Sequence, residues 1–195
     1  MFKRLLLILV LAGFLASAPG SEACVGRILM VGGLDTPAGR VMGEMLALLI
    51  NERTGTTVNT NYYENSAALY RAVKAEEVGI LLENTVSAQQ ILKISVEEDK
   101  DKAYVKVKEA YRKDLNLIWL SPFGFFKAAG PEHESVSAAV LSFSVMTDFP
   151  GLPRLLNKLA EKMDDRDYAG LVKAVGSGTD PRAAAKDFLN LKKLI

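Results

Sequence analysis

The chain has 195 residues, 49% of them hydrophobic, which suits one globular domain and leaves little room for two large ones. Its formal net charge is +1, with 24 basic and 23 acidic residues and no basic cluster or tail, so nucleic acid is not expected as a partner. A single cysteine allows no intramolecular disulfide, so the core must hold the fold by itself.

The first 23 residues have the pattern of an export signal rather than of a domain. Lys3 and Arg4 precede an apolar run that begins at Leu5, and small residues lead to Ala23. We expect cleavage after Ala23, which leaves residues 24–195 in the periplasm or on the outer face of the membrane. The apolar run is shorter than the roughly 20 residues that a membrane-spanning helix needs, so a permanent anchor is not favoured.

Cys24 would be the first residue after cleavage, and two interpretations are open. Either Cys24 carries a lipid, or it is a lone cysteine beside an ordinary signal site. Ser21 and Glu22 stand where a lipidation signal normally has a leucine near position −3, which favours the second interpretation. Contact with a membrane is expected only through such a lipid or through a membrane partner.

Apolar strands alternate with amphipathic helices in the first half of the chain. Successive βαβ units of this kind pair their strands in parallel. Asp35 or Thr36 can cap the first helix, and Pro37 suits its first turn because a missing N–H costs nothing there. The expected elements are a strand at 28–31, a helix at 37–53, a strand at 57–63, a helix at 67–75 and a strand at 78–82.

The second half continues this pattern less regularly. Asn84 or Thr85 can cap a helix, and apolar spacing predicts another helix at 104–115. Strands are expected at 117–120 and 138–146, and the remainder is expected to be helical. The whole pattern predicts an α/β fold with a mainly parallel sheet of about five strands flanked by helices.

Signs of catalysis are few. His133 is the only histidine and lies in a polar turn, so a Ser-His or Cys-His pair is not expected. Gly32-Gly33 lacks both the spacing of a dinucleotide site and the Gly-Lys-Ser/Thr of a phosphate loop. Carboxylates are scattered among lysines, which does not suit a metal site. The sequence predicts a protein that is not an enzyme, with neither cofactor nor metal.

A binding site is expected where the strands end. In open parallel sheets, ligands bind beyond the carboxyl ends of the strands. Helix N-termini at Pro37 and Thr85 would offer N–H groups to an anion, and aromatic rings would suit a cation. Equally, the polar residues could be ordinary caps and the aromatic residues core. The candidate ligand-binding residues are Gly33, Asp35, Thr36, Tyr63, Asn84, Thr85, Ser121 and Phe123.

Several short motifs occur in the order of one known family. They are Gly43-Glu44-Met45-Leu46, Glu83 with Thr85, Trp119-Leu120 with Pro122 and Gly124, and Phe149-Pro150-Gly151-Leu152. In these motifs the chain resembles the substrate-binding proteins of glycine betaine, choline and proline ABC importers, the quaternary-ammonium branch. The resemblance implies a periplasmic-binding-protein-like fold, a betaine-like or amino-acid-like solute as ligand, and a permease or partner lobe as protein partner.

Two departures from that family bear on function. Residues 24–195 are expected to form a single lobe, because residues 125–136 are only a short link where the family inserts a second lobe. Asn84 stands where the family has a ligand-facing tyrosine. The first hypothesis is therefore solute capture at the rim of one lobe for an ABC importer, with altered binding. The alternative is an interaction module that has lost its ligand and docks on a membrane or periplasmic partner protein.

Overall fold

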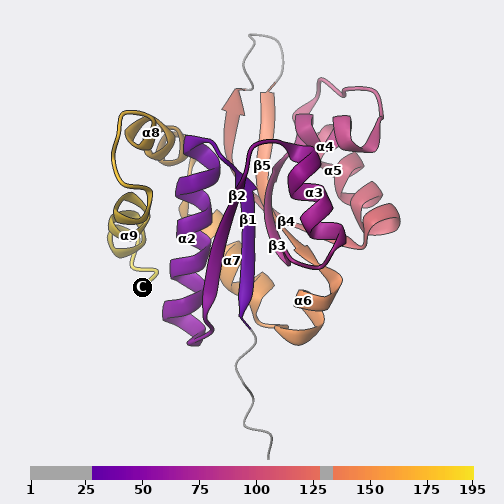
Figure 1. The fold of residues 1–195 in the computed structure, drawn as a ribbon. Coiled ribbons are helices and arrows are strands. Elements are labelled where there is room, and N and C mark those ends of the chain that lie inside the picture. The colour runs from indigo at the N-terminus through magenta and orange to yellow at the C-terminus, as the bar shows by residue number, and fades with distance from the viewer. Residues whose placement is uncertain (1–27, 128–133) are drawn as a thin grey trace, which may run out of the picture.

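The computed structural model describes residues 28–127 and 134–195. They form three layers, in which a five-stranded sheet lies between two groups of helices (Figure 1). The strand order is β2-β1-β3-β5-β4, so β2 and β4 are the edge strands. The strands are β1 (Leu29–Leu34), β2 (Val58–Tyr63), β3 (Ile80–Asn84), β4 (Leu117–Lys127) and β5 (Glu134–Ser142).

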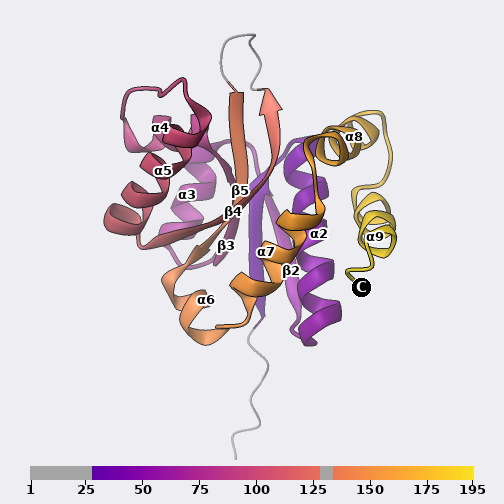
Figure 2. The ribbon, with the colours of Figure 1, turned by 180° about the vertical axis from the view of Figure 1, so that it is seen from behind.

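The helices divide between the two faces of the sheet (Figures 1 and 2). The first face carries α2 (Pro37–Thr54), α7 (Leu152–Lys162), α8 (Asp165–Gly176) and α9 (Pro181–Leu191). The second face carries α3 (Ser66–Lys74), α4 (Thr85–Leu92) and α5 (Lys100–Ala110), which continues into a π-helical turn at Tyr111–Leu115. The short α6 (Phe143–Asp148) lies at the end of the sheet where β1 begins. No helix in these ranges is both long and apolar enough to cross a membrane.

The predicted α/β fold with five strands is confirmed, but the prediction of a mainly parallel sheet is wrong. β1 pairs in parallel with β2 and β3, whereas β5 pairs antiparallel with both β3 and β4. The two longest strands, β4 and β5, are joined by residues 128–133. Six residues can join antiparallel neighbours but are too few for the crossover that a parallel pair requires. The sheet is therefore mixed, with β5 reversed.

The fifth strand is also displaced from its predicted position. It ends at Ser142, whose side chain caps α6 by accepting a hydrogen bond from the Val145 N–H at 3.3 Å. Phe143, expected inside a strand, is 62% exposed at the start of that helix. Residues 125–136, expected as a short link, comprise the end of β4, the start of β5 and the segment 128–133. Residues 1–23, Cys24 and His133 lie outside the described residues.

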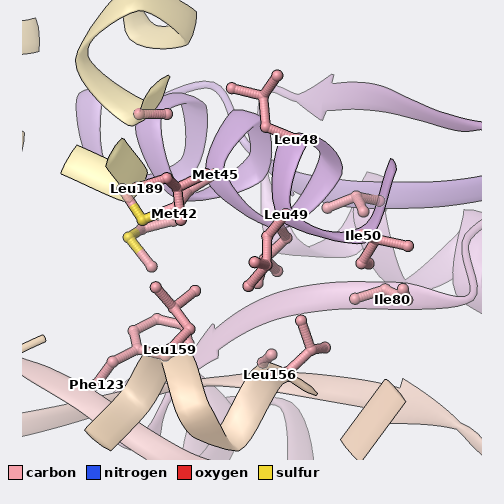
Figure 3. Packing of buried hydrophobic residues seen from close by; sticks show 14 of the residues in the cluster. Met42, Met45, Leu48, Leu49, Ile50, Ile80, Phe123, Leu156, Leu159 and Leu189 are labelled. Carbon is pink, nitrogen blue, oxygen red and sulfur yellow. The ribbon is translucent and has the colours of Figure 1, made fainter. Parts of the chain in front are cut away.

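The larger hydrophobic cluster fills the first face. Buried side chains of α2 pack onto Leu156 and Leu159 of α7, and Leu189 of α9 closes the group from the side (Figure 3). Helix α2 is capped by Thr36 at its start and by Gly55 at its end. The φ of Gly55 is 70°, the left-handed conformation that glycine adopts without strain. A smaller cluster on the second face centres on Tyr111 and Trp119.

Glycine brings the start of α2 against the end of β1. A Cβ at Gly39 would lie 2.0 Å from the carbonyl oxygen of Leu34, a backbone atom that cannot move aside. Only a residue without a side chain permits this approach. The first turn of α2 is thereby held close to the carboxyl end of β1, at the predicted rim.

Candidate functional site

A cavity of about 300 Å³ opens at the carboxyl ends of β1 and β3, on the first face of the sheet. We call it the rim pocket. Its size is at the lower end of the roughly 300–1,000 Å³ typical of small-molecule sites. The walls come from β1, the start of α2, β3, β4, β5 and α8. The residues that line it are Leu34, Thr36, Pro37, Ala38, Gly39, Met42, Leu82, Glu83, Asn84, Phe123, Ser137, Tyr168 and Val172.

Three of the eight predicted binding residues line the rim pocket, namely Thr36, Asn84 and Phe123. Thr36 is the N-cap of α2, and its hydroxyl oxygen accepts a hydrogen bond from the Gly39 N–H at 3.1 Å. That hydroxyl still has a proton to donate. Thr36 thus serves as a cap and also presents a polar group at the pocket wall.

Asn84, at the end of β3, likewise caps a helix and lines the rim pocket. Its side-chain oxygen accepts hydrogen bonds from the Ser87 N–H at 2.9 Å, which caps α4, and from the Ser135 hydroxyl at 3.1 Å. Since both bonds use the oxygen, the amide NH₂ group retains its two donors. Asn84 is therefore held in place by two partners and can donate to a ligand.

Two aromatic rings contribute to the wall of the rim pocket. Phe123 of β4 and Tyr168 of α8 are both buried, with ring centroids 6.4 Å apart and planes tilted by 39°. Burial raises the pKa of the Tyr168 hydroxyl, so it stays neutral. An aromatic face contributes roughly 0.5–2 kcal/mol to binding a cation. These two rings pack against each other, and both belong to the hydrophobic core.

The remaining five predicted residues do not line the pocket. Gly33 pairs with Tyr62 inside the sheet, and Tyr63 packs against the cluster on the second face. The Asp35 carboxylate accepts a hydrogen bond from Arg40 Nε at 2.6 Å. Thr85 is 1% exposed, and its hydroxyl oxygen accepts a hydrogen bond from the Val136 N–H at 3.1 Å. Ser121 is exposed, and its N–H donates to Asn157 Oδ1 at 3.0 Å.

The first turn of α2 has little left to offer an anion. Pro37 has no N–H, the Gly39 N–H is capped by Thr36, and the Arg40 N–H donates to the Thr36 carbonyl oxygen. Within the described structure, only the Ala38 N–H of this turn has no partner. A single N–H is a weak site, because anion sites at helix N-termini use several such groups together.

Glu83 is the only carboxyl group among the described lining residues, and its side chain is directed away from the rim pocket. Successive residues of a strand face opposite sides, so Leu82 and Asn84 point to the pocket while Glu83 points to the second face with Leu81. There the Tyr70 hydroxyl donates to Glu83 Oε2 at 2.6 Å, and the Asn84 N–H donates to Oε1 at 2.8 Å. Burial raises the pKa of this carboxyl group above its usual range.

Several lining residues were not predicted, chiefly Met42, Ser137, Tyr168 and Val172. Met42 lies on the apolar face of the 37–53 helix, and Tyr168 and Val172 lie on one apolar stripe of a later helix. A helical stripe shows which residues face inward, but it does not show which of them meet the end of a distant strand.

The comparisons with known proteins concern the fold. No family model matches the sequence, and no curated protein matches it. Among solved structures, a glycine betaine/carnitine/choline ABC transporter protein superimposes with a TM-score of 0.75 at 14% identity, covering 86% of this chain and 98% of the other. Apo YehZ from Escherichia coli gives 0.75 at 13% identity, covering 87% and 100%. A choline-binding ABC-transporter protein in complex with choline gives 0.51 at 11% identity, covering 86% and 90%.

These likenesses show that the chain has the fold of such binding proteins, as the sequence motifs suggested. The described residues form one lobe around one sheet. Within the same residues no group of three or more His, Cys, Asp or Glu side chains is placed to hold a metal ion.

Proposed function

We propose that this protein is the solute-binding component of an ABC-type importer and holds a small solute in the rim pocket. The observation that carries the proposal is the position of that pocket. It lies at the carboxyl ends of β1 and β3, where open α/β sheets bind ligands, on a fold shared with betaine- and choline-type binding proteins. Known neighbours of this fold include a protein solved with choline bound.

The rim itself favours a solute over the alternative of a protein docking surface. A contiguous exposed apolar patch of several hundred Å² at the rim would favour docking of a protein partner. The large apolar side chains that are exposed in the described structure are Ile28, Val96, Val105, Leu115, Phe143 and Leu191, and none of them lines the rim pocket. A concave cavity with a few polar groups is instead the usual form of a small-molecule site.

Binding to one lobe differs from binding between two. With a single lobe the solute keeps part of its surface in water, so less desolvation contributes to affinity. We therefore propose altered or weak binding by this chain alone, strengthened when a partner lobe, a second copy or the permease covers the pocket. The proposal also includes export, with removal of residues 1–23, which cell fractionation and mass determination of the mature chain would test.

The test is isothermal titration with betaine, choline, proline and amino acids, together with uncharged compounds of similar size. We expect saturable binding by at least one class and its loss in Val172→Phe, which places a ring into the pocket. The matched control is Val175→Phe, a half-buried position of the same helix that does not line the pocket. If no compound binds detectably at millimolar concentration, or if both variants lose binding equally, the pocket is excluded as a solute site.

A further inference from the structure

We infer that the rim pocket selects an uncharged solute, one with a compact hydrocarbon body and a single hydroxyl, carbonyl or amide group. This inference rests on the proposed function, since it names the class of solute for the same pocket. It follows from the charges that reach the cavity, the state of its aromatic wall and the polar groups that remain free to bind.

No ionised side chain among the described lining residues opens into the cavity. Glu83 is the only candidate, and its two oxygens accept from Tyr70 and Asn84 on the other side of β3. Arg40 and Asp35, which are close in sequence to the lining of α2, lie outside the lining, and their opposite charges are paired with each other at 2.6 Å. A charged solute entering the pocket would lose water without gaining a counter-ion, which is costly.

The aromatic wall does not compensate a cation for that loss. One ring face contributes roughly 0.5–2 kcal/mol to holding a cation, and recognition of quaternary ammonium groups uses cages of several aromatic faces. Here Phe123 and Tyr168 are the only two aromatic residues of the described lining, they pack against each other, and both belong to the core. The rest of the apolar wall is aliphatic or thioether, chiefly from Met42, Leu82 and Val172, whose side chains belong to the first-face cluster. Such a wall suits hydrocarbon.

The free polar groups in the pocket are all neutral. The Asn84 amide NH₂ group and the Thr36 hydroxyl can each donate, and the hydroxyls of Ser137 and Tyr168, which interact with each other, are neutral as well. The α2 N-terminus adds only the Ala38 N–H. This set matches one neutral oxygen on the ligand, because a carboxylate would need more donors, and charged ones, to replace its water.

The test is a pair of ligands that differ only in charge, choline and 3,3-dimethylbutan-1-ol, in which carbon replaces the quaternary nitrogen. We expect the alcohol to bind the full mature chain at least about tenfold more tightly in parallel titrations. A second measurement uses Val172→Asp, which adds a carboxylate at the wall, with Val175→Asp as the control outside it. Val172→Asp should shift the choline-to-alcohol affinity ratio toward choline by at least about tenfold, and Val175→Asp should leave it unchanged.

The outcomes separate the two claims. If choline binds as tightly as the alcohol or more tightly, the pocket accepts charge and this inference is wrong, while solute binding at the rim stands. If no compound of either class binds at millimolar concentration, the proposed function itself fails. Should Val172→Asp not fold, the comparison of the two ligands on the unmodified chain still decides.

Discussion

The two faces of the sheet use aromatic and polar residues in opposite ways. On the second face, edge-to-face contacts link Tyr70 to Tyr111, Tyr111 to Trp119 and Trp119 to Tyr104, and the Tyr70 hydroxyl donates to the buried Glu83 carboxyl group. On the first face, Phe123 and Tyr168 stand at the edge of an open cavity whose free polar groups are neutral. In the described structure the second face thus contains a buried acid, and the first contains the rim pocket, into which no ionised side chain opens.

The difference indicates which face can bind. A buried carboxyl group that already accepts two hydrogen bonds stabilises the interior and gives a ligand nothing further. Neutral donors at a cavity wall have unused capacity, as Asn84 does. Both faces meet at the end of β3, where Glu83 and Asn84 are consecutive residues facing opposite sides. The predictions below test whether the two faces are as separate as the geometry indicates.

The largest expected effect is on the second face. Trp119 is 1% exposed, and its replacement in Trp119→Ala should lower the free energy of unfolding by about 3–5 kcal/mol, measured by urea denaturation. Its indole N–H has no hydrogen-bond partner in the described structure. Trp119→Phe should therefore cost only about 1–2 kcal/mol, from lost volume alone. Affinity at the rim pocket should be unchanged in Trp119→Phe, and a tenfold change would show that the faces are coupled.

Removal of one hydroxyl group should have the next largest effect. Tyr70→Phe leaves the buried Glu83 Oε2 without its donor and should cost about 1–3 kcal/mol. The hydroxyl of Tyr111 contacts the Tyr70 hydroxyl and not the carboxyl group, so Tyr111→Phe should cost about 0.5–1.5 kcal/mol. Urea denaturation of both variants measures the order. A reversed order would contradict the assignment of Tyr70 as the principal donor.

The buried Glu83 carboxyl group should also make the free energy of unfolding depend on pH. Burial raises its pKa above the usual 4.5, so the folded protein keeps this proton at pH values where the unfolded chain has lost it. The free energy of unfolding should fall as pH rises above about 4.5, by up to about 1.4 kcal/mol per unit, until the folded-state pKa is passed. Glu83→Gln lacks the proton and should not show this decline. Parallel slopes for the two proteins would contradict a raised pKa.

The smallest effect should come from an ion pair on the first face. Arg182 of α9 contacts Glu44 of α2 at 2.9 Å, but its side chain is 62% exposed. Arg182→Ala should cost only about 0–1 kcal/mol by urea denaturation, since exposed pairs contribute little and Glu44 keeps its bonds from Thr60 and Tyr62. A loss of several kcal/mol would mean that ion pairing, and not apolar packing, joins these helices.

Local structure was predictable from the sequence where the signals are local. The Thr36 cap, Pro37 and Gly55 bound α2 at Pro37–Thr54, close to the predicted 37–53. Asn84 caps α4 as one of two predicted candidates. These features depend on residues within one turn of each other, so a single sequence contains them.

Features that depend on distant contacts were not predictable. Apolar alternation does not reveal strand direction, and β5 is reversed because six residues connect it to β4. Tyr168 reaches the rim only because α8 packs beside the end of β4, which no local pattern encodes. Conversely, Thr85 fits the pattern of a rim residue, but its hydroxyl accepts a bond from the Val136 N–H of β5 and is buried.

The most direct test of the account uses the methionine methyl groups of the folded chain. Met42 lines the rim pocket on the first face, whereas Met30 packs against the cluster on the second. With ¹³C-labelled methionine methyls, titration with 3,3-dimethylbutan-1-ol should shift the Met42 signal saturably and leave the Met30 signal in place. If Met42 stays unmoved at millimolar ligand, or if Met30 moves as far, the rim pocket is not the solute site.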